Sequence, residues 1–502
     1  MISSGLPDQP PGDAKAAFCR AWHPGCETFG YALNFVKRVA ERSSTHPVFL
    51  MQRKHLLPFL IALAATLPGL GLHLGRIHTS APVSTLASGG AIIAASFLLL
   101  WACDAAQTEV SQGLALAGVA LIAVLPEYSV DMYFTWQAGR YPQADYAHYA
   151  IANMTGANRL LIGVGWAMIV AVYWLRTRRD VELETDRRSE LFFLGLATLY
   201  ALVIPLKGTL AWYDGLVFLG IYLWYLRVAG RRSCAEVEAE GPAALLVGLP
   251  RRQRRLAIGG LFVFAGAVIL ANAEPFSEGL LATGRLFHIN EFLLVQWLAP
   301  IASESPEFIV ALMFAWRGQG GLALGSLLSS KLNQWTLLVG MIPGVYAVST
   351  GTLAHPLPLN NYQMSEILLT AAQSALGVVL LAGLRLSLGG AVLLFGLFIG
   401  QFILPLCSQW FPGLAFGLGS QQIHPVFVIL YVVVAFALAL QNPSALGWLK
   451  RGLDVNSCGG EAQIVTPGKE VPMLARCERC SWRVGENGEK QDSEVRSSGI
   501  KP

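Results

Sequence analysis

Long apolar segments are the feature that most constrains this chain. Each is long enough, or nearly so, to cross about 30 Å of hydrocarbon as a helix, and we count about twelve of them. Hydrophobic residues make up 54% of the chain and charged residues only 14%, which excludes an ordinary water-soluble domain of 502 residues. The sequence therefore predicts an all-α polytopic membrane protein surrounded by a lipid bilayer. The segments lie at 56–74, 86–104, 110–135, 147–175, 190–206, 210–226, 256–273, 286–316, 321–348, 365–383, 387–404 and 424–441.

Arginine and lysine collect in short clusters between these segments, at 53–54, 176–188, 227–255 and 450–451. Cytoplasmic loops are enriched in these residues, and a count of about twelve helices puts every cluster on the same side. We therefore expect both termini to be cytoplasmic, in a bacterial inner membrane or a plasma membrane. The net charge of +4 is not gathered on one continuous basic face, so a nucleic-acid partner is not expected.

Both ends of the chain are polar. Residues 1–55 hold no apolar run typical of a signal peptide, and Met51 stands before a basic cluster, so one hypothesis is that translation starts there. The tail, 450–502, is predicted to be a polar cytoplasmic extension. It contains Cys477 and Cys480 in a CxxC pair, a weak indication of zinc without a second pair.

Charged residues inside the apolar segments are the strongest functional indication. Glu304, Glu307 and Lys331 lie in or beside the eighth and ninth predicted helices, and Glu127 lies in the third. A charge at the centre of a bilayer costs roughly 2.5 to 3.5 kcal/mol on insertion scales, so such residues are usually functional. Asp214, His288 and Glu291 lie closer to span ends, where we expect them to snorkel to the interface.

The chain contains an internal repeat. Residues 125–134 (LPEYSVDMYF) align with 305–314 (SPEFIVALMF), and 152–158 (ANMTGAN) align with 325–331 (GSLLSSK). The number of predicted spans between the copies is odd, so the copies enter the membrane in opposite directions. Inverted repeats of this kind are a transporter architecture with the site near the bilayer midplane.

The repeated residues suit a hard cation. Pro126 and Pro306 each free the carbonyl four residues earlier, at Ile122 and Ala302, and each is followed by a carboxylate. Ser303, Glu304 and Glu307 share one helical face. Calcium takes about six to eight oxygen ligands, which two crossing helix pairs could supply.

These motifs resemble the alpha repeats of the cation/calcium exchanger superfamily, over about residues 86–404. The resemblance implies a five-plus-five inverted-repeat core with one flanking helix at each end, and antiport of a divalent cation against sodium, potassium or protons. It implies no cofactor other than the transported Ca²⁺ and Na⁺ or H⁺. The expected divisions are an N-terminal extension (1–55), a flanking helix (56–85), the first repeat (86–227), a basic loop (228–255), the second repeat (256–404), a second flanking helix (405–449) and the tail (450–502).

The resemblance also assigns site residues. Glu127 and Glu307 match the two central carboxylates and are expected to hold the transported metal ion. The full predicted cation-binding set is Glu127, Glu307, Ser303, Glu304, Ser330, Asn158 and Gln334, with Lys331, Asp131 and Asn153 as a possible tethered cation or as supporting residues.

Both repeats depart from the family pattern, and the predicted ligands concentrate in the second repeat. Ala123 and Val124 replace hydroxyl residues, and Leu161 replaces a coordinating amide. In the second repeat, Lys331 stands at an asparagine position. Its ammonium could pair with Glu304 or Glu307 and stand in for one sodium ion, or it could snorkel to the end of its helix; the sequence favours neither.

We predict a secondary active antiporter, with calcium against sodium or protons, working by alternating access around Glu127 and Glu307. The alternatives are a proton-coupled or monovalent-cation exchanger on the same fold, and a transport-inactive membrane scaffold. An enzyme is not expected, because HExxH, GxSxG and phosphate-loop motifs do not occur. The sequence does not indicate an oligomeric state.

Overall fold

The computed structural model describes residues 47–75, 77, 79–108, 124–230, 241–410, 420–443 and 447. All of them belong to one unit, Met1–Asn456. The predictions for Ile122, Ala123, Cys477 and Cys480, and those for the tail, lie outside the described residues, as do residues 1–46 of the N-terminal extension.

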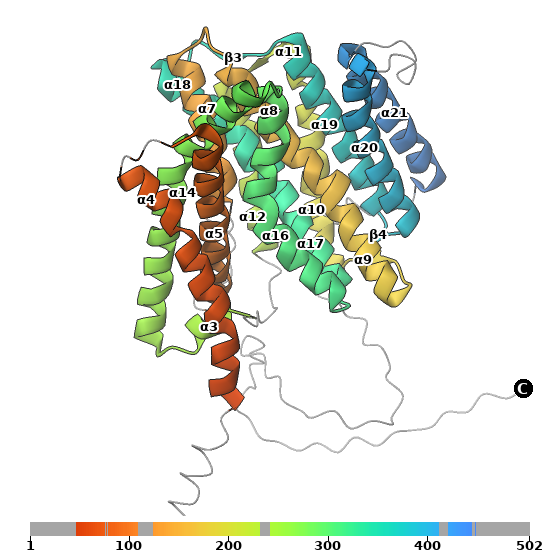
Figure 1. Cartoon of the computed structure of the whole chain (residues 1–502). Helices are drawn as coiled ribbons and strands as arrows, with labels where there is room; N and C mark the ends of the chain where they lie inside the picture. Colours follow the sequence, from red (N-terminus) through yellow and green to blue (C-terminus); the bar gives the residue numbers. More distant parts are fainter. Residues whose placement is uncertain are drawn as a thin grey trace, which may run out of the picture. The chain divides into compact units, whose positions relative to one another are not determined.

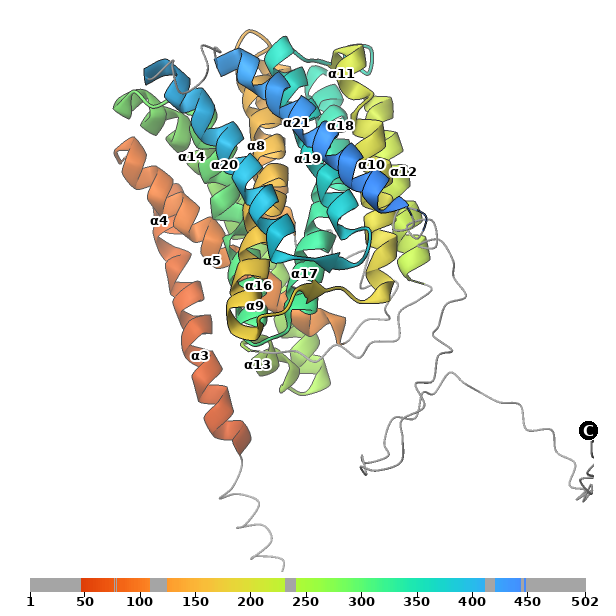
Figure 2. The same ribbon diagram turned by 90° about the vertical axis from the view of Figure 1, so that its right-hand side faces the viewer.

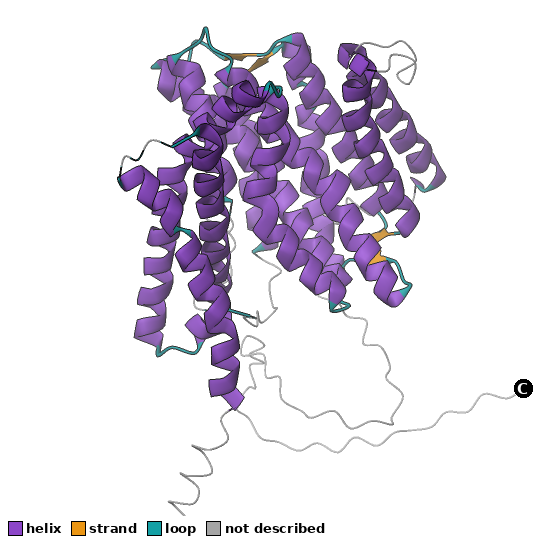
Figure 3. Ribbon diagram, in the orientation of Figure 1, coloured by secondary structure: helices purple, strands orange, loops and turns teal. Residues whose placement is uncertain are grey.

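Helices dominate the described chain (Figure 3). The first half contains α3 (Pro47–Ala65), α4 (Leu67–Leu74), α5 (Ala81–Gln107), α7 (Leu125–Arg140), α8 (Tyr146–Leu160), η1 (Leu161–Trp166), α9 (Ala167–Thr177), β1 (Val181–Glu182), η2 (Thr185–Arg187), α10 (Arg188–Ala201), α11 (Ile204–Lys207), β2 (Thr209–Leu210) and α12 (Trp212–Ala229). The second half contains α13 (Ala243–Val247), α14 (Arg251–Phe287), α15 (Glu291–Leu293), η3 (Leu294–Leu298), α16 (Ala299–Trp316), α17 (Gly320–Asn333), η4 (Gln334–Leu338), α18 (Val339–Thr350), β3 (Leu357–Pro358), α19 (Asn361–Leu381), β4 (Arg385–Leu386), α20 (Leu388–Trp410) and α21 (Ser420–Gln441).

The predicted class, an all-α polytopic membrane protein, is confirmed, and the helices follow the predicted segments closely. Within the described ranges, 9 helices are long and apolar enough to cross a membrane, so the expected count of about twelve is consistent but not confirmed. The main differences in boundary are at α3, which begins at Pro47 instead of at position 56, and at α14, which continues to Phe287. The next helix begins at Glu291 instead of at position 286.

The sequence repeat has a counterpart in the backbone. A stretch of π-helix interrupts each second repeat helix, η1 after α8 and η4 after α17. These stretches begin at Leu161 and Gln334, which are equivalent positions when Asn158 is aligned with Lys331. A π-helix widens the turn and is common at functional sites, so both repeats distort their backbone at the same place.

Two short strand pairs tie loops together at the ends of the helices. Strand β1, after α9, pairs with β4, between α19 and α20. Strand β2, before α12, pairs with β3, before α19. The sequence-based helix count puts the first two loops on one side of the membrane and the other two on the opposite side. The pairing of the loops therefore agrees with that count.

The repeat helices pack across the two halves. Helix α14 lies along α5, α12 packs on α18, and α20 packs on α9 (Figure 1). The last helix, α21, lies beside α19 and also contacts α20 (Figure 2). Helix α21 was expected only to flank the core, but this packing brings its side chains against a core helix.

One expectation about interfacial residues was wrong. Asp214 is fully buried instead of snorkelling. Its carboxylate accepts from the backbone N–H of Ala211 at 2.7 Å, which caps α12, and pairs with Lys207 at 2.5 Å. These two interactions stabilise the buried carboxylate, because burying a charge is costly unless it is paired and hydrogen-bonded.

Candidate functional site

Three carboxylates from the two repeats lie near one another. Glu127 is in the first turn of α7, and Glu304 and Glu307 are in α16. The acids of the two repeats interact electrostatically: Glu127 of the first repeat interacts with both Glu304 and Glu307 of the second. Glu127 is 2% exposed and Glu304 is 0% exposed, whereas Glu307 is half-buried. The fold therefore brings together acids that are far apart in the sequence.

The local sequence explains where these acids stand. Pro126 lies in the first turn of α7, where a proline is tolerated because the first N–H groups have no partner within the helix. The next residue, Glu127, then sits at the positive end of the helix dipole. Pro306 lies inside α16 and removes one donor there, which leaves the carbonyl of Ala302 without its usual helical partner.

Glu304 has one oxygen bound and one oxygen open. Its Oε1 accepts a hydrogen bond from Nε2 of Gln334, at the start of η4. Within the described part of the chain, Oε2 of Glu304, Oε2 of Glu127 and Oε1 of Gln334 are buried without a hydrogen-bond partner. Buried acceptors that lack a donor are unfavourable in a protein alone, and a cation is the partner that carboxylate and amide oxygens suit.

Asp131 is one turn beyond Glu127 and is fully buried. Its Oδ1 accepts from Nδ2 of Asn153 at 2.8 Å. Among the described residues, neither Oδ2 of Asp131 nor Oδ1 of Asn153 has a hydrogen-bond partner. The two predicted supporting residues therefore bind each other and still present one free oxygen each.

Lys331 is 0% exposed, so the expectation that it could snorkel was wrong. Its Nζ donates to Oδ1 of Asn158 at 2.7 Å and to the Asn158 carbonyl at 3.3 Å. The ammonium also lies 4.5 Å from the centre of the Trp335 ring, a cation–π contact. Glu304 is within electrostatic range of Lys331, but no ion pair joins them among the described residues.

The two predicted serine ligands, Ser303 and Ser330, are both buried. Ser303 is 5% exposed, and its hydroxyl donates to backbone carbonyls of its own helix, at 3.4 Å to Ala299 and 3.3 Å to Pro300. Ser330 is also 5% exposed. In the described ranges, no group of three or more histidine, cysteine, aspartate or glutamate side chains is arranged to hold a metal ion.

A second buried polar cluster was not predicted from the sequence. Arg159 and Glu366 form an ion pair in which the side chains are 1% and 0% exposed. Gln296 and His424 also contact Glu366. Arg159 and Glu366 each stand inside a predicted span, so the rule that applied to Glu304 would have identified them. His424 lies at the start of the last span and has no such indication.

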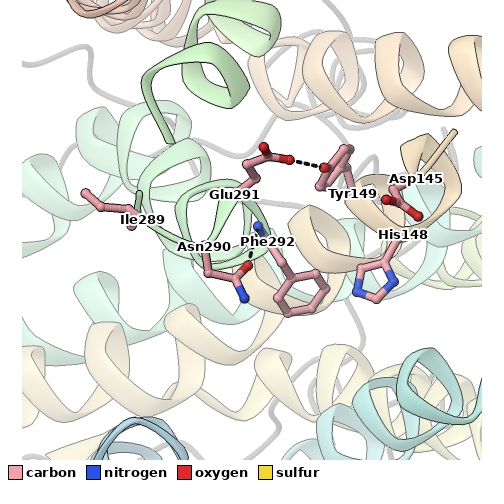
Figure 4. Close-up of a pocket in the computed structure, with 7 residues that line it drawn as sticks. All are labelled: Asp145, His148, Tyr149, Ile289, Asn290, Glu291 and Phe292. Carbon is pink, nitrogen blue, oxygen red and sulfur yellow. Dashed lines mark hydrogen bonds between the residues drawn. The ribbon is translucent and has the colours of Figure 1, made fainter. Parts of the chain in front are cut away.

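An open pocket of about 420 Å³ lies at the start of α8 (Figure 4). It is lined by the start of α8 and the α14–α15 connection: Asp145, His148, Tyr149, Ile289, Asn290, Glu291 and Phe292. Glu291 accepts a hydrogen bond from Tyr149 and pairs with Arg285 at 2.8 Å, so its charge is already compensated.

Known proteins resemble this chain over most of its helical part. The family model described as sodium/calcium exchanger protein matches residues 80–230 and 258–406. The crystal structure of an H⁺/Ca²⁺ exchanger, CAX, is 41% identical with a TM-score of 0.74, and the match covers 80% of this chain and 100% of that one. The sodium-calcium exchanger NCX_Mj is 20% identical with a TM-score of 0.43, over 69% of this chain and 98% of that one.

A curated relative, the uncharacterized membrane protein MJ0091 of Methanocaldococcus jannaschii, is 26% identical over 175 residues, 35% of this chain and 52% of the relative. The chain thus spans about half the length of that relative. The matches confirm the predicted resemblance and the helical exchanger fold, including an integral membrane location. The chain belongs to the sodium/calcium exchanger family, within the cation/calcium exchanger superfamily.

Proposed function

We propose that this protein is a cation antiporter that moves calcium against protons by alternating access around Glu127 and Glu307. The observation that carries the proposal is the meeting of acids from α7 and α16, one helix from each inverted repeat, with buried carboxylate oxygens that have no described partner. Two helices that cross between repeats can change their relative position as the repeats rock, which would expose the site to each side in turn.

Protons are a better counter-ion than sodium for this chain. Sodium sites need several oxygen ligands, and the first repeat has Val124 and Leu161 where the family has a hydroxyl and an amide. Asn158 offers its amide oxygen to Lys331 instead. Protons need only the carboxylates themselves, and the similar CAX structure is of an H⁺/Ca²⁺ exchanger.

Lys331 acts in this proposal as a tethered cation. Its ammonium holds the position that a second monovalent ion would otherwise share with Asn158, and its charge offsets part of the negative charge of the three acids. The remaining predicted ligands are Ser303 of α16, Ser330 of α17 and Gln334 of η4, and Gln334 donates a hydrogen bond to Glu304. The basic clusters of the loops support a cytoplasmic location for both termini.

The test is transport in proteoliposomes with imposed calcium, sodium and proton gradients. Wild-type protein should take up calcium when the internal pH is lower than the external pH, and both Glu127→Gln and Glu307→Gln should abolish uptake. Glu182→Gln is the control, since Glu182 is an exposed acid in strand β1. Equal uptake by wild type and Glu307→Gln would reject the proposal, and uptake driven by sodium alone would reject the proton coupling.

A further inference from the structure

Glu366 is the centre of the second buried polar cluster. Its Oε2 accepts hydrogen bonds from the Arg159 guanidinium, from Nε2 of Gln296 at 2.6 Å and from Oγ1 of Thr155 at 3.4 Å. The donors come from α8 and η3, while Glu366 belongs to α19. One carboxylate oxygen is therefore fully supplied with donors inside the protein.

The other oxygen faces a histidine. Oε1 of Glu366 lies 3.1 Å from Nδ1 of His424, whose side chain is 7% exposed. Among the described residues, neither of these two buried atoms has a hydrogen-bond partner. A carboxylate oxygen can only accept, so a proton on Nδ1 would give both atoms a partner. When Nε2 is already protonated, that proton makes an imidazolium beside a carboxylate.

Charged and titratable groups surround this pair. The Glu366 carboxylate and the Arg159 guanidinium both act on His424. Among the described residues, His148 from α8 and Tyr362 from α19 act on Glu366, and Tyr431 from α21 interacts with Arg159. With neutral His424 the Arg159–Glu366 pair has no net charge, and one bound proton makes the cluster positive.

Two aromatic ring contacts connect the pocket to the His424–Glu366 pair. His148 lines the pocket and stacks on Tyr362, with ring centres 5.6 Å apart and planes 11° apart. Tyr362 in turn lies 5.3 Å from the His424 ring. The pocket of Figure 4 thus reaches to within two ring contacts of His424.

Helix α8 connects the cluster to the cation site. Arg159 pairs with Glu366, and the preceding residue, Asn158, binds the ammonium of Lys331. Adjacent helix residues point about 100° apart, so one turn of α8 presents one side chain to each network. A change in the strength of the Arg159–Glu366 ion pair would therefore affect the position of Asn158, which binds the Lys331 ammonium.

We propose that His424 and Glu366 form a proton-binding site, separate from Glu127 and Glu307, whose occupation opposes cation binding at those acids. The proton is taken from water and returned to water. Helix α21, which supplies His424, lies outside the residues that match the family, 80–230 and 258–406. Only the coupling to transport rests on the proposed function; the proton site itself does not.

The test is a titration of the histidine side chains by NMR, with the full-length protein in lipid nanodiscs and ¹⁵N-labelled imidazoles. His424→Gln identifies the His424 resonance. We expect the His424 resonance to titrate, with a midpoint that falls in Glu366→Gln and rises in Arg159→Gln, because these variants remove opposite charges. His355→Gln, which changes an exposed histidine, should leave the midpoint unchanged.

Wild-type protein gives a second measurement that does not depend on the folding of a variant. Saturating calcium should lower the His424 midpoint, and by reciprocity calcium should bind more weakly below that midpoint. A His424 resonance that does not titrate, or that titrates identically in Glu366→Gln, would overturn the proton site. An unchanged midpoint with calcium would overturn the coupling. Absent calcium flux with an intact titration would instead count against the proposed antiport.

Discussion

The ammonium of Lys331 lies 2.7 Å from the amide oxygen of Asn158. The two residues are equivalent positions of the two inverted repeats, so the repeats meet at their own matching residues. A symmetric pair of amides at these positions could share a cation between them. Here a lysine stands at one of the two positions, and we propose that its ammonium takes the place of that cation.

Lys331→Asn should therefore alter ion coupling. The substitution removes a fixed charge and leaves two facing amides, so we expect a sodium-dependent component of calcium uptake that wild type lacks. Lys331→Met is the matched control, since it removes the charge without adding an oxygen. Uptake should be measured with sodium and proton gradients imposed separately. Identical ion dependence in wild type and Lys331→Asn would contradict a tethered cation.

Glu304→Gln should weaken calcium binding without abolishing transport. Glu304 shares the buried site with Glu127 but already has one oxygen bound to Gln334. We expect at least a tenfold rise in the calcium concentration for half-maximal uptake, which corresponds to about 1.4 kcal/mol. Glu127→Gln should lose uptake at all calcium concentrations. If Glu304→Gln keeps the wild-type concentration dependence, Glu304 does not contact the cation.

Gly156→Ala should destabilise the fold. A Cβ at Gly156 would overlap the backbone oxygen of Gln296, so α8 and η3 would have to separate. Gly220 in α12 has open space where a Cβ would lie, and Gly220→Ala should be neutral or stabilising by up to about 1 kcal/mol. Thermal unfolding in detergent should show a lower midpoint for Gly156→Ala only. Equal midpoints would mean that the two helices can move apart freely.

Arg159→Leu should destabilise the protein by about 3–5 kcal/mol, because it leaves Glu366 buried without its cation. The double variant Arg159→Leu/Glu366→Leu removes both charges and should recover part of that loss. Arg385→Leu is the control: it belongs to an exposed pair with Asp180, worth at most about 1 kcal/mol. Unfolding midpoints measure all three. A double variant no more stable than Arg159→Leu would show that the pair is not the source of the loss.

The sequence predicted the acids of the site well because their environment was informative. Glu127, Glu304 and Glu307 stand in apolar runs where a charge is costly, and the Pro-Glu repeat linked the first to the last. Gln334 came from the resemblance, and the structure places it against Glu304. Their roles as ligands stay predictions.

Arg159 and Glu366 also stand in predicted spans, where a charge is costly. They have no counterparts in the repeat pattern, so the repeat comparison did not point to them. Nothing in the sequence indicates a role for His424, because a histidine near the end of a membrane span is common. Only the packing of α21 along α19 brings it to Glu366. Lys331 was left between two alternatives. Its burial against Asn158 excludes snorkelling, and its role as a tethered cation stays a prediction.

The sequence by itself determined the membrane class, the helical segments and the inverted repeat, because hydrophobicity and the insertion cost of charges act along the chain. The tertiary structure alone decided which polar groups meet. A buried charge takes its partner from whatever helix lies beside it, and neighbouring helices are set by packing between segments far apart in the chain. That is why Lys331 faces Asn158, and why Glu366 holds both Arg159 and His424.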